Sequence, residues 1–159
     1  MFELRKAKTS EAEAILRLYR CAAKAEGCTW DEGYPNAQTV AEDLAAESLY
    51  VLDMEGKPAG CVSVVPENEL DGLDCWQVTE SCCEIARVAI DRQLQGRGLS
   101  KELLRLLFAE LSRQGLRSVH ILVAEQNLIA RRTYASLGFE FYGNYFMFGH
   151  DFIAAEKLL

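Results

Sequence analysis

The sequence predicts an α+β protein with about four helices and six strands. Apolar residues recur with helical period in residues 10–27, 37–46, 99–115 and 127–137. Short apolar runs bounded by turn residues indicate strands at residues 48–54, 58–65, 82–90, 119–124, 139–142 and 145–152. The length of 159 residues is ordinary for one globular domain, so residues 1–159 are expected to form a single domain.

Turn and capping residues set the limits of the first elements. Thr9-Ser10, followed by acidic residues, caps a first helix that is expected to end near Gly27. Asn36 caps the second helix. The sequence Glu55-Gly56-Lys57 joins the first two strands as a hairpin, and residues 66–76 are expected to form a loop.

The second half of the chain places a glycine turn between a strand and a strongly periodic helix. The strand 82–90 leads into Gly96-Arg97-Gly98, and the helix that begins there ends at Gly115. Residues 119–124 are apolar apart from His120, a pattern expected in the middle of a covered sheet.

Composition excludes several classes of protein. Hydrophobic residues make up 50% of the chain and charged residues 26%, which excludes a disordered chain or a low-complexity linker. The formal charge of −7 opposes attraction to nucleic acid or to an anionic membrane surface. The N-terminus lacks the apolar core of a signal peptide, and no apolar run approaches the roughly 20 residues that span a bilayer. The protein is therefore expected to be cytoplasmic, with neither nucleic acid nor a membrane as its partner.

The six cysteines are expected to be free thiols in a reducing compartment. They form no C-x-x-C pair, and His120 and His150 are far from them in the sequence, so no set has the spacing of zinc ligands. No metal cofactor is expected. Cys82 and Cys83 are adjacent in a strand and should point to opposite faces, which fits one buried and one less buried residue better than a disulfide.

The glycine turn is a candidate phosphate site. Backbone amides of Gly96-Arg97-Gly98 at the start of a helix can point at an anion. A dinucleotide fingerprint would need a third glycine where Lys101 stands, and a P-loop would need Gly-Lys-Ser/Thr, which is absent. A tight strand-to-helix turn without a ligand is the alternative interpretation.

A basic stripe rises from this turn. Arg97, Lys101 and Arg105 recur every four residues and share one side of the helix. On an acidic protein such a stripe favours an anionic ligand. A solvated helix face, partly offset by Glu102 and Glu110, is the alternative.

Two motifs carry a resemblance to a known family. Gln93-Leu-Gln-Gly-Arg-Gly98, preceded by the strand Arg87-Val-Ala-Ile90 and Asp91, resembles the Q/R-x-x-G-x-G/A acetyl-CoA motif of the Gcn5-related N-acetyltransferase (GNAT) superfamily. Asn127-x-x-Ala130-x-x-x-Tyr134-x-x-x-Gly138-Phe139 resembles its second motif. The resemblance implies the GNAT fold, with a mixed, mostly antiparallel central sheet of six to seven strands flanked by about four helices.

The resemblance also implies how acetyl-CoA is bound. Backbone groups of Val88, Ala89 and Ile90 would contact the pantetheine arm and the acetyl group, and Asn127 would hydrogen-bond the arm. The turn and first helical residues would bind the pyrophosphate, and these are Gln95, Gly96, Arg97, Gly98, Leu99, Ser100 and Lys101.

The resemblance implies an acid and a base for acetyl transfer. Tyr134 would protonate the departing thiolate, a role that suits a phenol with a pKa near 10. An aromatic core residue at helical spacing is the alternative for Tyr134. Glu84 is the candidate base, although a solvated edge carboxylate is an equal alternative. Strand alternation would put Glu84 on one face with Val88 and away from Arg87. Other family members carry an acid where this chain has Leu122.

The acceptor pocket is expected between two aromatic segments. The loop residues Trp30, Glu32 and Tyr34 would line one wall, and residues 145–150 would form the other. An aromatic hook that pins the loop to the core is the alternative for this loop.

The sequence therefore predicts an acetyl-CoA-dependent N-acetyltransferase acting on a primary amine by direct attack in a ternary complex. A GNAT-fold protein that binds CoA as a sensor or interaction module is the second hypothesis, and a nucleotide-phosphate binder is the third. The acidic balance favours a cationic or neutral acceptor such as a polyamine, an aminoglycoside or a lysine-bearing peptide. A homodimer is compatible with the sequence.

Overall fold

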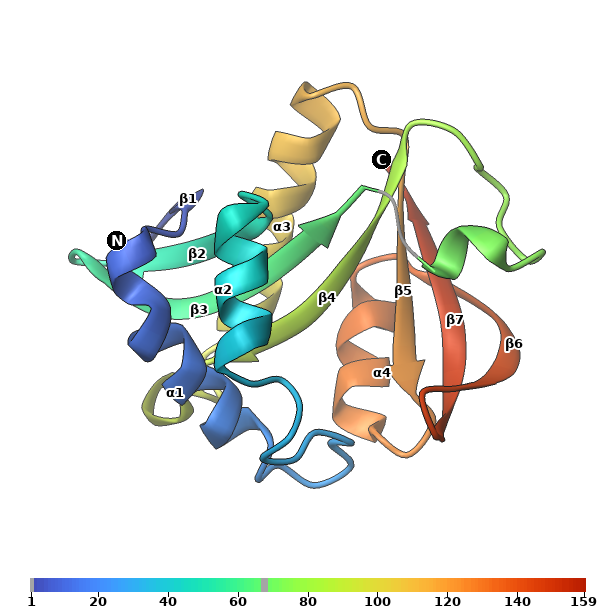
Figure 1. Cartoon of the computed structure of the whole chain (residues 1–159). Helices are drawn as coiled ribbons and strands as arrows, with labels where there is room; N and C mark the ends of the chain where they lie inside the picture. Colours follow the sequence, from blue (N-terminus) through green and yellow to red (C-terminus); the bar gives the residue numbers. More distant parts are fainter. Residues whose placement is uncertain (1, 67–68) are drawn as a thin grey trace.

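A seven-stranded sheet forms the centre of the molecule (Figure 1). The computed structural model describes residues 2–66 and 69–159. The strands are β1 (Phe2–Lys6), β2 (Leu49–Met54), β3 (Lys57–Val65), β4 (Cys82–Ile90), β5 (Ser118–Ala124), β6 (Glu140–Met147) and β7 (His150–Leu158). They lie in the order β1-β2-β3-β4-β5-β7-β6, and all neighbours are antiparallel except β4 and β5. The mixed, mostly antiparallel sheet confirms the predicted α+β class.

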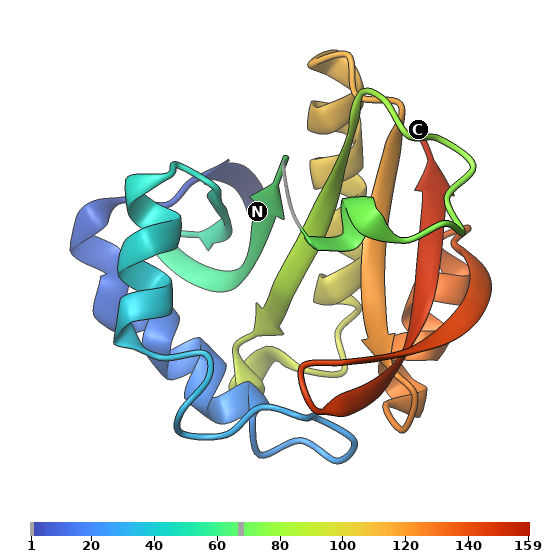
Figure 2. The ribbon, with the colours of Figure 1, turned by 45° about the vertical axis from the view of Figure 1, so that its right-hand side comes forward.

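Helices cover both faces of this sheet (Figure 2). The helices are α1 (Ala12–Ala22), α2 (Ala37–Ala45), α3 (Leu99–Arg113) and α4 (Leu128–Ser136). The side chains of β2 alternate between the two faces of the sheet, so this strand packs against helices on both sides. Leu49 and Val51 pack with α1 and α2, whereas Tyr50 and Leu52 belong to the larger core beneath α3 and α4. None of the described helices is long and apolar enough to cross a membrane.

β4 and β5 pair over part of their length and then diverge (Figures 1 and 2). Their parallel pairs are Cys82–Ser118, Cys83–Val119 and Glu84–His120. Beyond Glu84, β4 pairs with β3 on one side only, while β5 pairs with β7 along its whole length. Residues 85–90 and 121–124 therefore face each other across an opening in the sheet. α3 follows the end of β4, and α4 follows the end of β5.

A β-bulge interrupts β4 just beyond this branching point. Arg87 has a φ of 55°, and the register with β3 shifts between the pairs Cys61–Ala89 and Ser63–Ala86. Arg87 and Val88 thus stand opposite a single residue of β3, which bends the strand and reverses the alternation of side chains. Val88 packs on the α3 side, so the expectation that it shares a face with Glu84 is wrong.

Most predicted elements are confirmed, with corrections at the two ends of the chain. β1 was not predicted, because two apolar residues among charged ones give a five-residue edge strand a weak signal. The first helix ends at Ala22, and residues 23–27 form turns. The last hairpin turns at Phe148 and Gly149, whose φ values are 54° and 80°, and the predicted break near residues 143–144 is a register shift inside β6.

The predicted loop 66–76 and the cysteine assignment can also be placed. The loop contains a short 3₁₀ helix at Glu69–Gly72, and its residues 67–68 lie outside the described part of the chain. All six cysteines are free thiols. Cys83 is buried and Cys82 is half-buried, which confirms the assignment of the adjacent pair to opposite faces.

Candidate active site

The turn between β4 and α3 presents a run of unpaired backbone amides. Gly96 and Gly98 have φ values of +82° and +73°, which glycine adopts without a Cβ clash. The first hydrogen bond of α3 runs from the Glu102 amide to the Gly98 carbonyl at 3.1 Å. Among the described residues, the amides of 96–101 have no hydrogen-bond partner. A Cβ on either glycine would meet no atom within 4 Å, so an anion can approach this turn closely.

Basic side chains lie beside these amides. Arg97 and Arg105 are exposed and Lys101 is half-buried along the first turns of α3. None of the three forms an ion pair with another described residue. The positive end of the helix dipole lies at the same place. The turn and the stripe together offer an anion both hydrogen-bond donors and uncompensated positive charge.

Arg87 is a residue of the site that the sequence did not reveal. The bulge directs its side chain to α2, where Nε and Nη2 donate to the two carboxylate oxygens of Asp43 at 3.0 and 2.9 Å. Its Nη1 donates to the Tyr34 hydroxyl at 2.9 Å. Asp43 also accepts a hydrogen bond from the buried Ser63 hydroxyl at 2.8 Å. Arg87 therefore ties β4 to α2 and to the loop between α1 and α2.

Glu84 belongs to the last residue pair before β4 and β5 separate. Its side chain is half-buried, and this loss of solvation raises its pKa to about 7. The nearby Arg87 guanidinium lowers the pKa, whereas the carboxylates of Glu69 and Asp71 raise it. Asp43 engages Arg87, and none of the salt bridges among the described residues includes Glu84. A carboxyl group with a pKa near 7 can exchange a proton at neutral pH.

α4 carries the two residues that the second motif points to. Asn127 caps the helix, and its Oδ1 accepts from the Ala130 amide at 3.2 Å. Tyr134 is 7% exposed and packs edge-to-face on Phe139, with ring centroids 5.3 Å apart. Burial raises the pKa of Tyr134 above its ordinary value, so the phenol stays protonated at neutral pH. Tyr134 is thus part of the main core, and its role as an acid stays a prediction.

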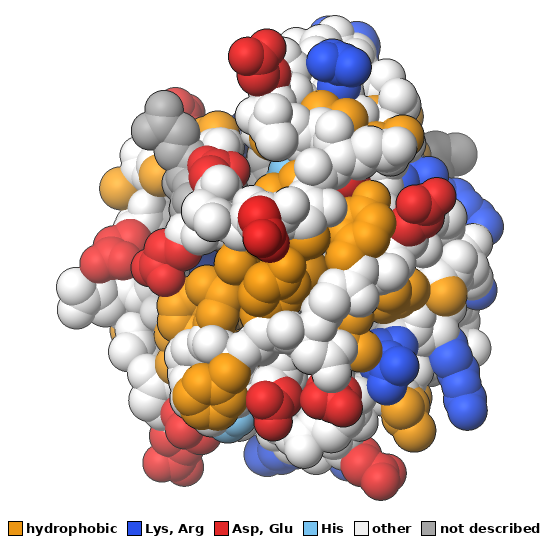
Figure 3. All heavy atoms as spheres, turned by 90° about the vertical axis from the view of Figure 1, so that its right-hand side faces the viewer, with side chains coloured by type: hydrophobic (Ala, Val, Ile, Leu, Met, Phe, Trp, Pro, Cys, Tyr) orange, Lys and Arg blue, Asp and Glu red, His pale blue; other side chains and the backbone are white. Residues whose placement is uncertain are grey.

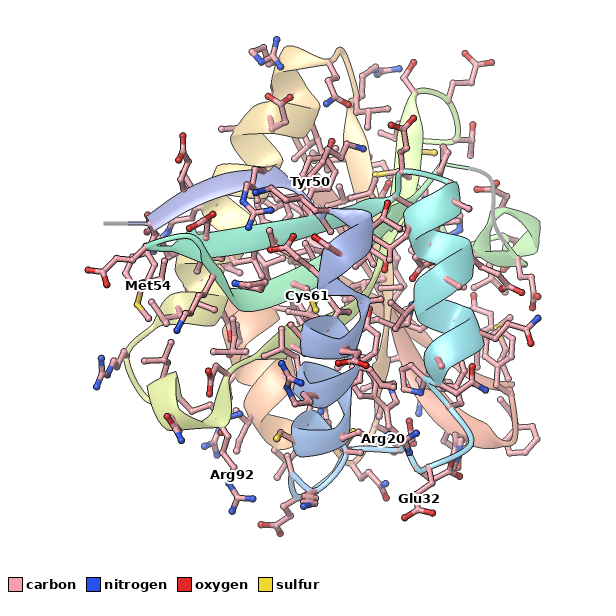
Figure 4. All side chains as sticks on the ribbon, turned by 60° about the vertical axis from the view of Figure 1, so that its left-hand side comes forward. Arg20, Glu32, Tyr50, Met54, Cys61 and Arg92 are labelled. Carbon is pink, nitrogen blue, oxygen red and sulfur yellow. The ribbon has the colours of Figure 1, made fainter. Side chains whose placement is uncertain are left out.

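The loop between α1 and α2 contains the predicted acceptor residues. Trp30 packs edge-on against Tyr19 with ring centroids 5.6 Å apart, as the aromatic-hook interpretation expects. Tyr34 is held by Arg87 and is 48% exposed. Glu32 is exposed, and its carbonyl oxygen accepts from Arg20 of α1 at 3.1 Å (Figure 4). The loop is therefore anchored at several points rather than projecting freely.

This loop also contacts the β5 side of the opening. Gly27 packs so closely that a Cβ there would lie 2.8 Å from the Gln126 carbonyl oxygen and 2.9 Å from the Asn127 Cα. The loop thus touches the turn before α4 through Gly27 and touches β4 through Arg87. It spans the two diverging strands at their open end.

The face that lies on the right-hand side of Figure 1 carries an apolar surface (Figure 3), and the second predicted wall contains exposed aromatic side chains. Phe146 and Phe148 are 71% and 63% exposed, and the Tyr145 hydroxyl donates to Asp74 at 3.3 Å. Both ribbon views place the turn between β6 and β7 at the same end of the sheet as the α1–α2 loop (Figures 1 and 2). A wall formed by residues 145–150 stays a prediction.

Solved structures share this architecture. An acetyltransferase of the GNAT family from Streptococcus agalactiae has a TM-score of 0.84 at 20% identity, covering 99% of this chain and 95% of that chain. Phosphinothricin acetyltransferase from Sinorhizobium meliloti, solved in complex with acetyl-CoA, has a TM-score of 0.78 at 19% identity, covering 99% and 88%. The ribosomal-protein-S18-alanine N-acetyltransferase from Escherichia coli has a TM-score of 0.72 at 22% identity, covering 99% and 94%. At these identities, the likeness establishes the fold.

The sequence itself matches the acetyltransferase (GNAT) family over residues 12–139. No curated protein sequence matches the chain. The matched range includes the glycine turn, the bulged strand and α4, which are the elements that build the site described above. The chain therefore belongs to the acetyltransferase (GNAT) family.

Proposed function

We propose that the protein is an N-acetyltransferase that moves the acetyl group of acetyl-CoA to a primary amine by direct attack in a ternary complex. The backbone amides of 96–101, which no described residue satisfies and which lie beside the opening between β4 and β5, carry this proposal. An anion-binding turn next to a break in a sheet gives CoA one place for its pyrophosphate and another for its arm. The family membership and the acetyl-CoA complex of the Sinorhizobium meliloti relative support it.

Residues at β4 and residues that follow β5, on the two sides of the opening, would hold the cosubstrate. The amides of 96–101 would donate to the pyrophosphate, with Arg97 and Lys101 adding charge. Backbone groups of residues 88–90 face the opening and would receive the arm, and the side-chain amide of Asn127 would reach it from α4. Bound acetyl-CoA supplies an acyl thioester at the end of that arm.

The chain would move the protons of the reaction. Glu84 takes a proton from the acceptor ammonium group, which frees the nitrogen lone pair. The amine nitrogen then bonds to the acetyl carbon as the carbon–sulfur bond breaks, and its surplus proton passes to solvent. Tyr134 gives its hydroxyl proton to the departing thiolate and regains one from the solvent, and Glu84 releases to the solvent the proton that it took from the ammonium group. The balanced products are the acetylated amine, CoA thiol and one proton.

The charges near Glu84 favour a cationic acceptor. Glu69 and Asp71 lie close enough to raise the pKa of Glu84, so the approach to it carries negative potential. The guanidinium of Arg87, which lies near Glu84, is held by Asp43. A polyamine, an aminoglycoside or a lysine-bearing peptide satisfies this requirement.

A CoA-binding sensor is the second candidate, and the packing of Tyr134 favours it. The Tyr134 ring is part of the main core and packs edge-to-face on Phe139. A tyrosine retained for packing would leave the fold able to bind CoA without efficient transfer.

One experiment distinguishes these functions. Release of free thiol from acetyl-CoA is followed across a panel of polyamines, aminoglycosides and lysine peptides, and calorimetry measures CoA binding in parallel. Turnover with any acceptor supports the enzyme, whereas CoA binding without turnover supports the sensor.

A matched pair of variants tests the turn itself. Gly98→Val should weaken CoA binding by at least about 100-fold, because a branched side chain blocks the backbone. Gly56→Val is the control, since Gly56 also has a positive φ and open space around it but lies in the β2–β3 hairpin. Wild-type CoA affinity in a folded Gly98→Val protein would contradict the proposed turn.

A further inference from the structure

Three side chains with metal-binding atoms meet on the sheet face that carries Glu84. Asp71 comes from the 3₁₀ helix Glu69–Gly72, Cys82 begins β4 and His120 lies in β5. One ligand atom from each residue lies within 4.8 Å of the others. Sequence spacing could not reveal this set, because the parallel pairing of β4 and β5 brings Cys82 next to the strand of His120.

The His120 ring is fixed with one nitrogen unused. Its side chain is 1% exposed, and its ring stacks on Trp76 with centroids 3.9 Å apart and planes 5° from parallel. The Nε2 atom lies 2.9 Å from Glu156 Oε2. The Nδ1 atom is buried and has no hydrogen-bond partner in the part of the chain that the structure describes. A fully buried polar nitrogen without a partner is uncommon and points to a missing ligand.

The surroundings of Glu156 determine which nitrogen of His120 carries the proton. Besides His120, the carboxylate of Glu156 accepts from the amides of Gln77 and Val78 and from the hydroxyls of Ser118 and Tyr142. A carboxylate surrounded by donors accepts from Nε2–H as well, which leaves a lone pair on Nδ1. A histidine whose second nitrogen donates to a carboxylate is the usual arrangement of a metal ligand.

We propose that Asp71, Cys82 and His120 bind a zinc ion through a carboxylate oxygen, Sγ and Nδ1. Zinc takes oxygen, sulfur and nitrogen ligands together in tetrahedral sites, and a water molecule would complete the fourth position. In such a site the ligand atoms are about 3.3–3.8 Å apart, so the side chains close by about 1 Å on binding. Cys82 binds as the thiolate and releases its proton to solvent.

The composition of the set favours zinc over other cations. Magnesium and calcium prefer oxygen ligands alone, and a buried imidazole with a thiol is a poor site for either. The three residues come from a loop and two strands, so the ion would fasten the loop before β4 to the sheet. A ligand that binds only the folded protein stabilises it.

Cobalt spectroscopy tests the site without reference to acetyl transfer. The full-length protein, reduced and stripped of metal with a chelator, is titrated with Co²⁺ and then with Zn²⁺. One equivalent of Co²⁺ should give a thiolate-to-cobalt band in the near ultraviolet and the intense visible bands of tetrahedral cobalt, and Zn²⁺ should displace it. Zinc at a hundredfold excess over its Kd should raise Tm by roughly 5–10 °C.

Matched variants assign the ligands. Cys82→Ser should abolish the thiolate band, and Asp71→Asn should weaken metal binding at least about tenfold. Cys75→Ser is the control, because Cys75 is a free half-buried thiol of the same loop outside the three-residue set. Binding of neither metal by the wild-type protein, a cobalt spectrum without a thiolate band, or wild-type binding by Cys82→Ser would each overturn the proposal. None of these outcomes bears on CoA binding or on acetyl transfer itself, so these stand or fall separately. A bound zinc ion would, however, reduce the negative potential that Asp71 contributes near Glu84, so the preference for a cationic acceptor is to be measured with the metal-free protein.

Discussion

The turn at residues 96–101 and the bulged segment at residues 84–87 occupy the two ends of one strand–turn unit, and they are built differently. The turn is exposed and offers backbone amides that no described residue satisfies. The bulged segment holds the half-buried side chains of Glu84 and Arg87, and the partners of Arg87 come from α2 and its preceding loop. A substitution in the turn should therefore weaken ligand binding alone. A substitution in the bulged segment should instead lower the stability of the fold or the rate of acetyl transfer.

The largest effect should come from removing the partner of Arg87. Asp43→Ala leaves the largely buried guanidinium of Arg87, whose side chain is 14% exposed, without its carboxylate, so the free energy of unfolding should fall by about 3 kcal/mol. Chemical denaturation measures this loss. Glu110→Ala is the control, because it breaks the exposed pair with Arg113 and should leave the denaturation midpoint unchanged. A small loss in Asp43→Ala would show that the segment depends on its partners no more than the turn does.

Removal of the candidate base should have the next largest effect. Glu84→Gln should lower kcat by about 10²–10³-fold, because the acceptor ammonium then keeps its proton. In the wild-type enzyme, kcat/KM should rise with pH through about 7, where Glu84 loses its proton. That rise should disappear in the variant.

The conversion of Glu80, an exposed carboxylate just before β4, to glutamine is the control for Glu84. Glu80→Gln should keep both the rate and the pH profile. A Glu84→Gln enzyme with normal kcat would assign proton removal to another group and leave Glu84 as a solvated edge carboxylate.

The sequence predicted the turn because its structural requirement is local. The positive φ values at Gly96 and Gly98 favour glycine, and the helix that follows requires a helical period of apolar residues. Both the glycines and the apolar period can be read from one short stretch of the sequence. The same holds for Asn36, whose side chain caps α2 by accepting from the Thr39 amide at 3.0 Å.

The bulged segment could not be predicted because its conformation depends on residues that are far away in the sequence. The partner of Arg87 lies 44 residues earlier in the chain, and nothing in the run from Glu84 to Ile90 shows where the alternation breaks. The raised pKa of Glu84 likewise depends on burial, which packing decides. Local residue types thus predicted the geometry of the glycine turn, which is the proposed CoA site, but not the bulge or the burial of Glu84.

Tyr134 lies on α4, which follows β5 on the other side of the opening. Its substitution should lower the rate less than the substitution of Glu84. Tyr134→Phe should lower kcat by about 10²-fold with little change in the Kd of acetyl-CoA, because the ring still packs on Phe139. The loss should shrink as pH approaches 9, since an unprotonated thiolate then departs more easily. Tyr50→Phe serves as the control, with its hydroxyl on β2 accepting from Gln114. A large rise in Kd would instead make Tyr134 a packing residue and support the sensor.

The smallest effect should come from the charges beside the turn. Because the amides of 96–101 already supply hydrogen bonds, Arg97→Ala/Lys101→Ala should weaken CoA binding by only about tenfold. The loss should be greatest for CoA, less for dephospho-CoA and least for pantetheine, in the order of their phosphate charge. The salt dependence of CoA binding should also flatten, since fewer exposed charges remain to be screened.

A second variant with the same change in net charge distinguishes direct contact between the basic side chains and CoA from long-range attraction between CoA and the whole protein. Arg17→Ala/Lys57→Ala removes two exposed basic residues on α1 and at the β2–β3 hairpin, away from the turn. It should leave the CoA affinity and its salt dependence close to those of the wild-type protein. Calorimetry with the three ligands at two salt concentrations measures both quantities. An equal loss for CoA and pantetheine in the Arg97→Ala/Lys101→Ala protein would make the stripe a solvated helix face, and the backbone amides alone would then account for anion binding.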